Sequence, residues 1–518
     1  MDAQRGIARR MVVGLPPEGL TASWEKDFSA YPPAGVILFR RDFRDLEELR
    51  RLTSRLRELT RPRRLFISID EEGGWVSQLD GHLMVPPNAA LLARGAAPGD
   101  VAEAHRVTAM RLRSLGLDWV FAPVADVNVE PRNPVIGARA FGADADTVSR
   151  MLGDALSGLR AGGVASCLKH FPGHGGTAVD SHLTLPVCAT DRATLDSREI
   201  APFRAHLTAS AIMTAHVVYP ALDAASPGTF SRAIVTGLLR DTLGFEGVCI
   251  TDALEMKGAA EGRGPYDSAR MALEAGCDLL LFAFHSEGVR RARLELANAL
   301  VDGVIDRASF DAARPRLEKF DREHSEPGPE DMTRPLDQLT PAGWRERIEA
   351  VIDRGLIVRG SLASDDTRGS PASDDTRGSL ASGVARGAGP AAAARVDLPP
   401  AAVRGPWHVT EPEYARGETL AARLAAEGVS LTADPDAAAA RVIAVASRVP
   451  LSADATAQLR AESGAHPTIL VGLQNDAFLD DVPEAALRLS AADCTEPTRR
   501  VVARRLAELV GRGAASSV

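Results

Sequence analysis

Residues 211–284 read AIMTAHVVYPALDAASPGTFSRAIVTGLLRDTLGFEGVCITDALEMKGAAEGRGPYDSARMALEAGCDLLLFAF. The stretch contains three short apolar runs, AIMTAHVV from Ala211, GVCITD from Gly247 and CDLLLFAF from Cys277, with long amphipathic segments between them. Short apolar runs of this kind predict buried strands, and the amphipathic segments predict helices. The stretch therefore predicts consecutive βαβ units, which build a parallel sheet.

Five earlier runs bring the number of predicted strands to eight within the first 290 residues. These runs are MVVGL from Met11, GVILF from Gly35, LFISID from Leu65, LDWVFAPVADV from Leu117 and VASCLKHF from Val164. Residues 45–59, 101–116 and 286–303 are among the predicted helices. An open doubly wound sheet usually has fewer strands and a glycine-rich first turn, and no GxGxxG follows the first run. We therefore predict an α/β protein with a (β/α)8 TIM-like barrel.

The sequence changes character after about residue 325. Residues 326–341 are rich in Pro, Glu and Asp without periodicity, which predicts a linker. Apolar runs return in residues 342–518 and predict a smaller C-terminal α/β domain. This domain is interrupted at 362–388 by a nine-residue repeat, LASDDTRGS, PASDDTRGS and LASGVARGA, whose composition predicts a disordered insertion. The predicted catalytic domain is thus 1–325.

Composition narrows the function classes for this chain of 518 residues. A formal net charge of −9 offers no basic surface for nucleic acid, so nucleic-acid binding is not predicted as the main task. The five cysteines never form a CxxC, which indicates buried thiols in a reducing compartment. Neither a signal-length apolar segment at the N-terminus nor a run of about 18 apolar residues occurs. We predict a cytoplasmic protein that does not span a membrane, and we leave its oligomeric state open.

Polar residues close several of the predicted strands: Asp70, Asp126, Lys169 with His170, His216 and Asp252. Active sites of (β/α)8 barrels lie where strands end and βα loops begin, so these side chains are predicted to meet there. Asp252 has two interpretations at this stage. It is either the N-cap of the helix that follows or a nucleophile for an anomeric carbon.

The densest cluster of ionisable residues is KHFPGHGGTAVDSHLTLP, residues 169–186. A carboxylate two residues from an imidazole, as in Asp180 and His182, can fix the tautomer of the ring and raise its pKa. The pair therefore suits general acid/base catalysis near neutral pH. The three histidines could instead bind a metal, but Pro172 and Gly173 separate the first two, and no HExxH motif or His/Cys zinc spacing is present. We predict no metal and no cofactor, and keep a metal-dependent barrel hydrolase as an alternative.

Taken together, these segments resemble glycoside hydrolase family 3, in its β-N-acetylglucosaminidase (β-hexosaminidase) branch. The matching stretches occur in order over nearly all of the first 320 residues, and KHFPGHG followed by DSH is the most specific of them. The others include GVILF at Gly35, DEEGG at Asp70, FAPVADV at Phe121, IGARAFG at Ile136, IMTAHVVYP at Ile212 and LLRDTLGFEGVCITDALEM at Leu238. The resemblance implies a retaining exo-hydrolase acting on terminal β-linked N-acetylglucosamine of muropeptides or chitin fragments.

The resemblance also implies a role for each site residue. Asp252 would attack the anomeric carbon, and His182, oriented by Asp180, would protonate the leaving oxygen and then activate water. Four residues would hold sugar hydroxyls in subsite −1: Asp70, Arg139, Lys169 and His170.

Two departures from the family pattern keep alternatives open. Trp75 replaces the arginine of the usual EGGRV, and Arg40-Arg41-Asp42 replaces the usual Arg-Asn. A phosphorylase or β-glucosidase of the same family and a sugar-binding protein without catalysis are the alternatives.

Overall fold

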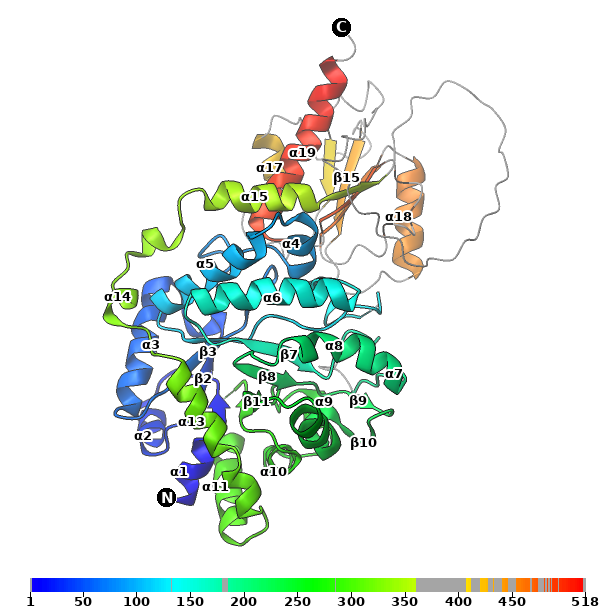
Figure 1. The fold of residues 1–518 in the computed structure, drawn as a ribbon. Helices are drawn as coiled ribbons and strands as arrows, with labels where there is room; N and C mark the ends of the chain where they lie inside the picture. Colours follow the sequence, from blue (N-terminus) through cyan, green and yellow to red (C-terminus); the bar gives the residue numbers. More distant parts are fainter. Residues whose placement is uncertain are drawn as a thin grey trace.

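The structure is a computed structural model. It describes residues 2–359 except 132, 179–184 and 285, and, in the C-terminal region, residues 407–410, 420–426, 432, 440–445, 453–465, 468–473, 479, 482, 485, 487–491 and 493–515. The nine-residue repeat at 362–388 lies outside the described residues. Figure 1 shows the barrel, coloured blue to green, and a smaller sheet with its helices, coloured yellow to red.

The eight predicted strands form a closed parallel barrel. The strands are β1 (Met11–Val13), β2 (Gly35–Leu38), β3 (Phe66–Ile69), β6 (Trp119–Val120), β7 (Cys167–Phe171), β8 (Ala211–Thr214), β11 (Val248–Ile250) and β12 (Leu280–Phe282). Hydrogen bonding gives the orders β12-β1-β2-β3-β6 and β11-β8-β7. Parallel bridges between Trp119 and Ala165 and between Ile250 and Leu279 join the two sections. This arrangement confirms the predicted barrel.

Helices cover the outside of the barrel (Figure 1). They include α1 (Ala3–Ala8), α2 (Ala22–Ala30), α3 (Leu46–Thr60), α4 (Ala89–Gly95), α5 (Asp100–Ser114), α6 (Ala145–Ala161), α7 (Arg192–Thr194), α8 (Ala201–Ala205), α9 (Lys257–Ala260), α10 (Pro265–Ala275), α11 (Glu287–Val301), α12 (Arg307–Asp311) and α13 (Arg314–Glu323). Side-chain caps define where several of these helices begin. Asp45 accepts a hydrogen bond from Glu48 N at the start of α3, and Asp144 accepts one from Thr147 N at the start of α6. Apolar faces then turn inward, as Leu49 and Leu56 of α3 do.

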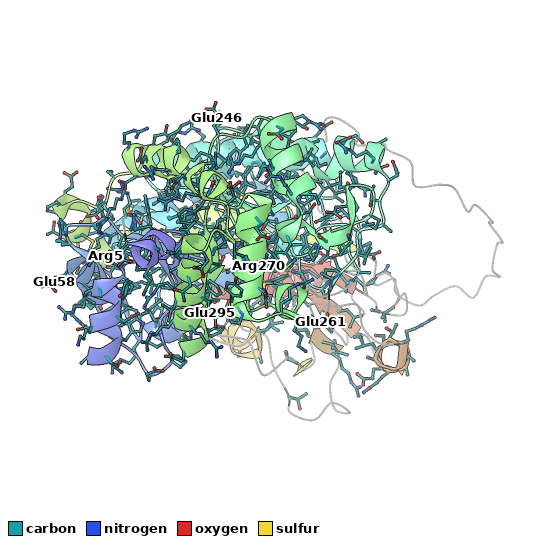
Figure 2. The ribbon with its side chains drawn as sticks, turned by 90° about the horizontal axis from the view of Figure 1, so that it is seen from below. Arg5, Glu58, Glu246, Glu261, Arg270 and Glu295 are labelled. Atoms are coloured by element: carbon teal, nitrogen blue, oxygen red, sulfur yellow. The ribbon has the colours of Figure 1, made fainter. Side chains whose placement is uncertain are left out.

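Charged side chains lie on the outer faces of these helices. Figure 2 shows Arg270 of α10 and Glu295 of α11 there, and each forms an i,i+4 ion pair of 2.7 Å within its own helix. The interior of the barrel is filled by apolar side chains from alternate strands, among them Ile37, Trp119 and Met213. Side chains at the strand ends are therefore supported from below by a packed core.

Short hairpins extend from the strand ends. They are β4 (Glu71–Gly73) with β5 (Val76–Ser77), and β9 (Val218–Tyr219) with β10 (Asp223–Pro227). The first hairpin follows β3 and carries Glu71 and Glu72 of the stretch DEEGG, so it brings acidic side chains to the carboxyl end of the barrel.

The C-terminal region contains a second, five-stranded sheet. Its order is β13-β17-β16-β15-β14, with β13 (Ile357–Arg359) antiparallel to β17 (Leu487–Ser490) and the remaining neighbours parallel. The other strands are β14 (Trp407–Thr410), β15 (Ala440–Val445) and β16 (Thr468–Gly472), and the helices are α17 (Leu420–Ala426), α18 (Ala453–Ala465) and α19 (Glu496–Ala515). These elements confirm the predicted smaller α/β domain.

The segment between the two sheets runs along the barrel. Two short helical turns, α14 (Pro329–Met332) and residues 336–339, lie within 326–341, and Asp331 forms a 2.7 Å ion pair with Arg113 of α5. Helix α15 (Trp344–Gly355) then packs against both α4 and α19. We propose the predicted division into 1–325, 326–341 and 342–518. Among the helices of the described residues, none is long and apolar enough to cross a membrane.

Candidate active site

A cavity of about 600 Å³ opens at the carboxyl ends of the barrel strands. Five of the predicted site residues line it: Asp70 after β3, Arg139 on the loop after β6, Lys169 and His170 of β7, and Asp252 after β11. Asp180 and His182 lie outside the described residues. The barrel therefore brings together side chains that are up to 182 positions apart in the sequence, from Asp70 to Asp252.

Four of the polar residues form a buried ionic network. Lys169 Nζ lies 2.7 Å from Asp70 Oδ1 and 2.6 Å from Glu72 Oε1. Arg139 donates two hydrogen bonds of 2.8 Å to the same Glu72 carboxylate. Burial alone would raise the pKa of Glu72, but the Arg139 and Lys169 cations lower it to about 2. Glu72 is therefore ionised at neutral pH, and the network presents fixed donors and acceptors to a polyhydroxylated ligand.

His170 is fixed by a carboxylate below the cavity. Its Nδ1 lies 2.7 Å from Asp126 Oδ2, and the Asp126 carboxylate also accepts the backbone N–H groups of His170 and His174. Burial would raise the pKa of Asp126, but His170 and the hydrogen bond from the His174 N–H lower it. An ionised Asp126 favours the proton on Nδ1, which leaves Nε2 of His170 as the nitrogen that can bond a ligand.

The Asp252 carboxylate follows β11 and does not cap a helix. The helix that follows, α9, has Met256 as its N-cap, so the N-cap interpretation of Asp252 is wrong. Its Oδ1 accepts a 2.7 Å hydrogen bond from the N–H of Ala253. Burial would raise the pKa of Asp252, but His170, His216 and Lys169 together with that N–H lower it. The carboxylate is thus ionised at neutral pH, as a nucleophile requires.

Aromatic side chains surround the outer part of the cavity. Trp75, Phe39 and Phe284 all line it, and Phe284 is 45% exposed. The Arg41 guanidinium lies 4.2 Å from the ring centroids of both Phe39 and Phe284, and it donates a 2.9 Å hydrogen bond to Ala283 O. Trp75, where the family pattern has arginine, therefore adds an apolar surface to the entrance instead of a cation.

Several residues of the cavity were not among the predicted site residues. Glu72 lines the cavity two positions after Asp70, and its place in the acidic run that follows β3 was the signal that could have selected it. Asp126, which was expected at the site because it closes a predicted strand, bonds His170 but does not itself line the cavity. His174 also lines the cavity, and burial lowers its pKa to about 4, which keeps the ring neutral. Among the described residues, no group of three or more His, Cys, Asp or Glu side chains is arranged to hold a metal ion.

Glu71 anchors the β4–β5 hairpin from beneath. Its carboxylate accepts hydrogen bonds from Ser77 Oγ and from the N–H groups of Gln78 and Leu79. Burial raises the pKa of Glu71 to about 7, and these hydrogen bonds offset only part of the increase. Between pH 4.5 and 7 the folded protein therefore holds a proton that the unfolded chain has released, so the free energy of unfolding falls as pH rises through this window.

We expect Glu71→Gln to remove this pH dependence. Wild type should lose about 3 kcal/mol more stability than the variant between pH 5 and pH 8, because the glutamine amide accepts the two backbone N–H groups without a charge to desolvate. Urea denaturation at both pH values measures the difference. Glu58→Gln, the same change at an exposed position labelled in Figure 2, should behave like wild type. Equal pH dependence in wild type and Glu71→Gln would contradict the prediction.

The chain shares this architecture with proteins of known family. Residues 20–319 match the family described as "Glycosyl hydrolase family 3 N terminal domain". A beta-hexosaminidase from Chromobacterium violaceum is 39% identical over 297 residues, which are 56% of this chain and 82% of that protein.

Two solved structures extend the comparison. The structure of a glycoside hydrolase family 3 beta-N-acetylglucosaminidase from Paenibacillus sp. str. FPU-7 superposes with a TM-score of 0.82 at 26% identity and covers 98% of this chain and 96% of that one. NagZ from Neisseria gonorrhoeae gives a TM-score of 0.55 at 31% identity over 66% of this chain and 96% of its own. These matches confirm the resemblance seen in the sequence and the prediction of a glycoside hydrolase. The chain belongs to glycoside hydrolase family 3.

Proposed function

We propose that this protein is a retaining exo-β-N-acetylglucosaminidase that releases terminal β-linked N-acetylglucosamine from muropeptides or chitin fragments. The observation that carries the proposal is the placement of Asp252, an ionised carboxylate, in the same cavity as the Asp70–Lys169–Glu72–Arg139 network. The β-hexosaminidase and β-N-acetylglucosaminidase relatives support N-acetylglucosamine as the sugar. The cytoplasmic location stays a prediction from cysteine usage.

In the first step, a carboxylate oxygen of Asp252 attacks the anomeric carbon. The bond between that carbon and the aglycone oxygen breaks, and the leaving oxygen receives a proton from His182, which Asp180 orients. The product of this step is a covalent glycosyl-enzyme. In the second step, His182 removes a proton from water, the water oxygen bonds to the anomeric carbon, and Asp252 leaves as a carboxylate.

The ionic network holds the sugar during both steps. Asp70, Lys169, Arg139 and His170 line the cavity and offer hydrogen bonds to the hydroxyls of the terminal sugar. Glu72 keeps the Lys169 and Arg139 cations in place, since it bonds both. Fixed donors and acceptors of this kind lower the cost of orienting the anomeric carbon against Asp252.

A side-by-side turnover assay tests the proposal. Aryl β-N-acetylglucosaminide and aryl β-glucoside are compared with and without phosphate and with and without a chelator. We expect aryl release from the N-acetylglucosaminide, with no requirement for phosphate and no loss to the chelator. Faster glucoside cleavage or dependence on phosphate would favour the glucosidase or phosphorylase alternative. Loss of turnover to the chelator would favour a metal-dependent hydrolase, and binding without release would favour a sugar-binding protein.

We expect Glu72→Gln to weaken both folding and catalysis. The variant leaves Lys169 and Arg139 buried without their shared anion, which should cost about 3 kcal/mol of stability and lower kcat/KM at least about tenfold. Urea denaturation and steady-state kinetics measure the two effects. Glu261→Gln makes the same change on the molecular surface (Figure 2) and should leave both quantities unchanged. A wild-type kcat/KM in Glu72→Gln would exclude a role for the network in holding the sugar.

A further inference from the structure

Three residues of the β4–β5 hairpin line the cavity: Glu72, Trp75 and Val76. Its turn consists of Gly74 and Trp75. Gly74 and the preceding Gly73, the last residue of β4, have φ angles of +56° and +94°, which are left-handed and favour glycine. Among the described residues, β4 and β5 pair only with each other. Besides the ion pairs of Glu72 with Arg139 and Lys169, the position of the hairpin in the cavity therefore depends on what its turn contacts.

The turn rests on residues 86–88. Gly74 N donates a 2.8 Å hydrogen bond to Pro86 O, and Trp75 N donates a 3.1 Å hydrogen bond to Asn88 Oδ1. A Cβ atom on Gly74 would lie only 1.6 Å from Asn88 Oδ1, so the two backbones fit together only with glycine there. Asn88 precedes α4 but makes no side-chain cap to this helix. Its side-chain oxygen holds the hairpin.

Asn88 in turn contacts the C-terminal domain. Its backbone N–H points to Asp493 Oδ1 at 3.4 Å, across 405 positions of sequence. The Asp493 side chain is fully buried, and its Oδ2 accepts hydrogen bonds from Thr495 Oγ1 at 2.5 Å and from Thr498 Oγ1. Oδ2 of Asp493 thus accepts hydrogen bonds from within the C-terminal domain, and Oδ1 accepts one from the barrel domain.

A second contact joins the C-terminal end of α4 to the C-terminal domain. Arg94 in the last turn of α4 donates a 3.3 Å hydrogen bond to Ser490 Oγ, at the end of β17. Helix α4 also packs on α15, where a Cβ on Gly95 would lie 1.8 Å from Val351 O. Helix α4, which Asn88 precedes, therefore contacts both the barrel and the C-terminal domain. Because these contacts hold α4 in place, we expect a substitution at Asp493 to displace Asn88.

We propose that Asp493 is a positioning residue of the active site, which fixes Trp75 and Glu72 in the sugar cavity through Asn88 and the Gly74-Trp75 turn. The proposal rests on the proposed function, because the cavity it tunes is the one that binds N-acetylglucosamine. It gives the C-terminal domain a task in catalysis although no residue of that domain lines the cavity among the described residues.

The test compares variants of the full-length chain with two readouts. One is kcat and KM on an aryl β-N-acetylglucosaminide, and the other is the emission of Trp75, obtained by subtracting the spectrum of the matching Trp75→Phe variant. Asp493→Ala should raise KM about tenfold with little change in kcat, and it should shift the Trp75 emission. Asp493→Asn should restore both towards wild type, because the amide oxygen still accepts from Asn88 N. If Asp493→Ala does not fold, Asp493→Ser replaces it, since its hydroxyl can still bond Thr498.

Two further variants distinguish a positioning role of Asp493 from a contribution to the stability of the C-terminal domain alone. Thr498→Val removes a contact of Asp493 inside the C-terminal domain, so it should lower the thermal midpoint and leave KM and Trp75 emission unchanged. Asn88→Ala should reproduce the KM and emission effects, and adding Asp493→Ala to it should cause no further change, because both residues act in one chain of contacts. Additive effects, or a Thr498→Val variant that matches Asp493→Ala in KM, would overturn the proposal.

The outcomes distinguish this proposal from the proposed function. If wild type cleaves no N-acetylglucosaminide while Asp493→Ala still shifts the Trp75 emission, the proposed function is wrong. The contacts from Asp493 through Asn88 to Trp75 are then supported on their own. If wild type cleaves the substrate while Asp493→Ala changes neither KM nor emission, the positioning role fails alone.

Discussion

Replacement of Asp252 by alanine should reduce kcat on an aryl β-N-acetylglucosaminide by about 10⁵-fold while the barrel stays folded. The variant removes the carboxylate that we propose to bond covalently with the anomeric carbon in the first step. Its effect on folding should be small, because the carboxylate accepts its one backbone hydrogen bond from its own neighbour, Ala253. Steady-state kinetics and thermal denaturation of the same preparation measure the two quantities.

Covalent labelling identifies the nucleophile directly. A 2-fluoro or 5-fluoro glycosyl inhibitor should label Asp252, located by peptide mass mapping. Asp70 and Glu255 are matched controls, since both are carboxylates of the same cavity. Burial raises the pKa of Glu255, and its carboxylate accepts the N–H groups of Ala283 and Phe284, so it is a poor nucleophile. A label on Glu255 or Asp70 would refute the assignment of Asp252.

The barrel and most of its site could be predicted because both follow from local patterns. Each strand has its own apolar run, and parallel strands end at one edge, so a polar residue that closes a run is placed at the site by topology alone. Strand lengths were less predictable. The run of eleven residues from Leu117 contains a strand of only two, Trp119–Val120, and Pro123 lies just beyond it without an N–H for a ladder.

Pairings between distant residues could not be predicted in the same way. Glu72 and Arg139 are 67 positions apart, and Asn88 and Asp493 are 405 apart. No local pattern records which strand-end carboxylate faces which cation, because that depends on loop paths and on how the two domains dock. The same reason explains why Glu72 was not singled out within the stretch DEEGG at Asp70.

Replacement of His182 by alanine should damage the cleavage of poor leaving groups by about 10²–10⁴-fold and leave activated aryl substrates much less affected. An alkoxide leaving group needs a proton as its bond to the anomeric carbon breaks, and His182 is the residue that we propose to supply it. A nitrophenolate is stable without that proton, so its glycosylation step survives the loss. Residues 179–184 lie outside the described residues, so this prediction rests on the sequence pattern and on the position of Lys169 and His170 in β7, the strand that precedes this loop.

The measurement is kcat/KM against the pKa of the leaving group for wild type, His182→Ala and Asp180→Ala. The slope should be steepest for His182→Ala. Asp180→Ala should show a weaker form of the same slope and a shifted pH optimum, because the carboxylate acts on the tautomer and the pKa of the imidazole. A metal ligand would behave differently, since its loss would slow all substrates alike and added zinc would restore part of the activity. Parallel plots for wild type and His182→Ala would refute the general-acid role and leave the leaving-group proton to another donor in the cavity.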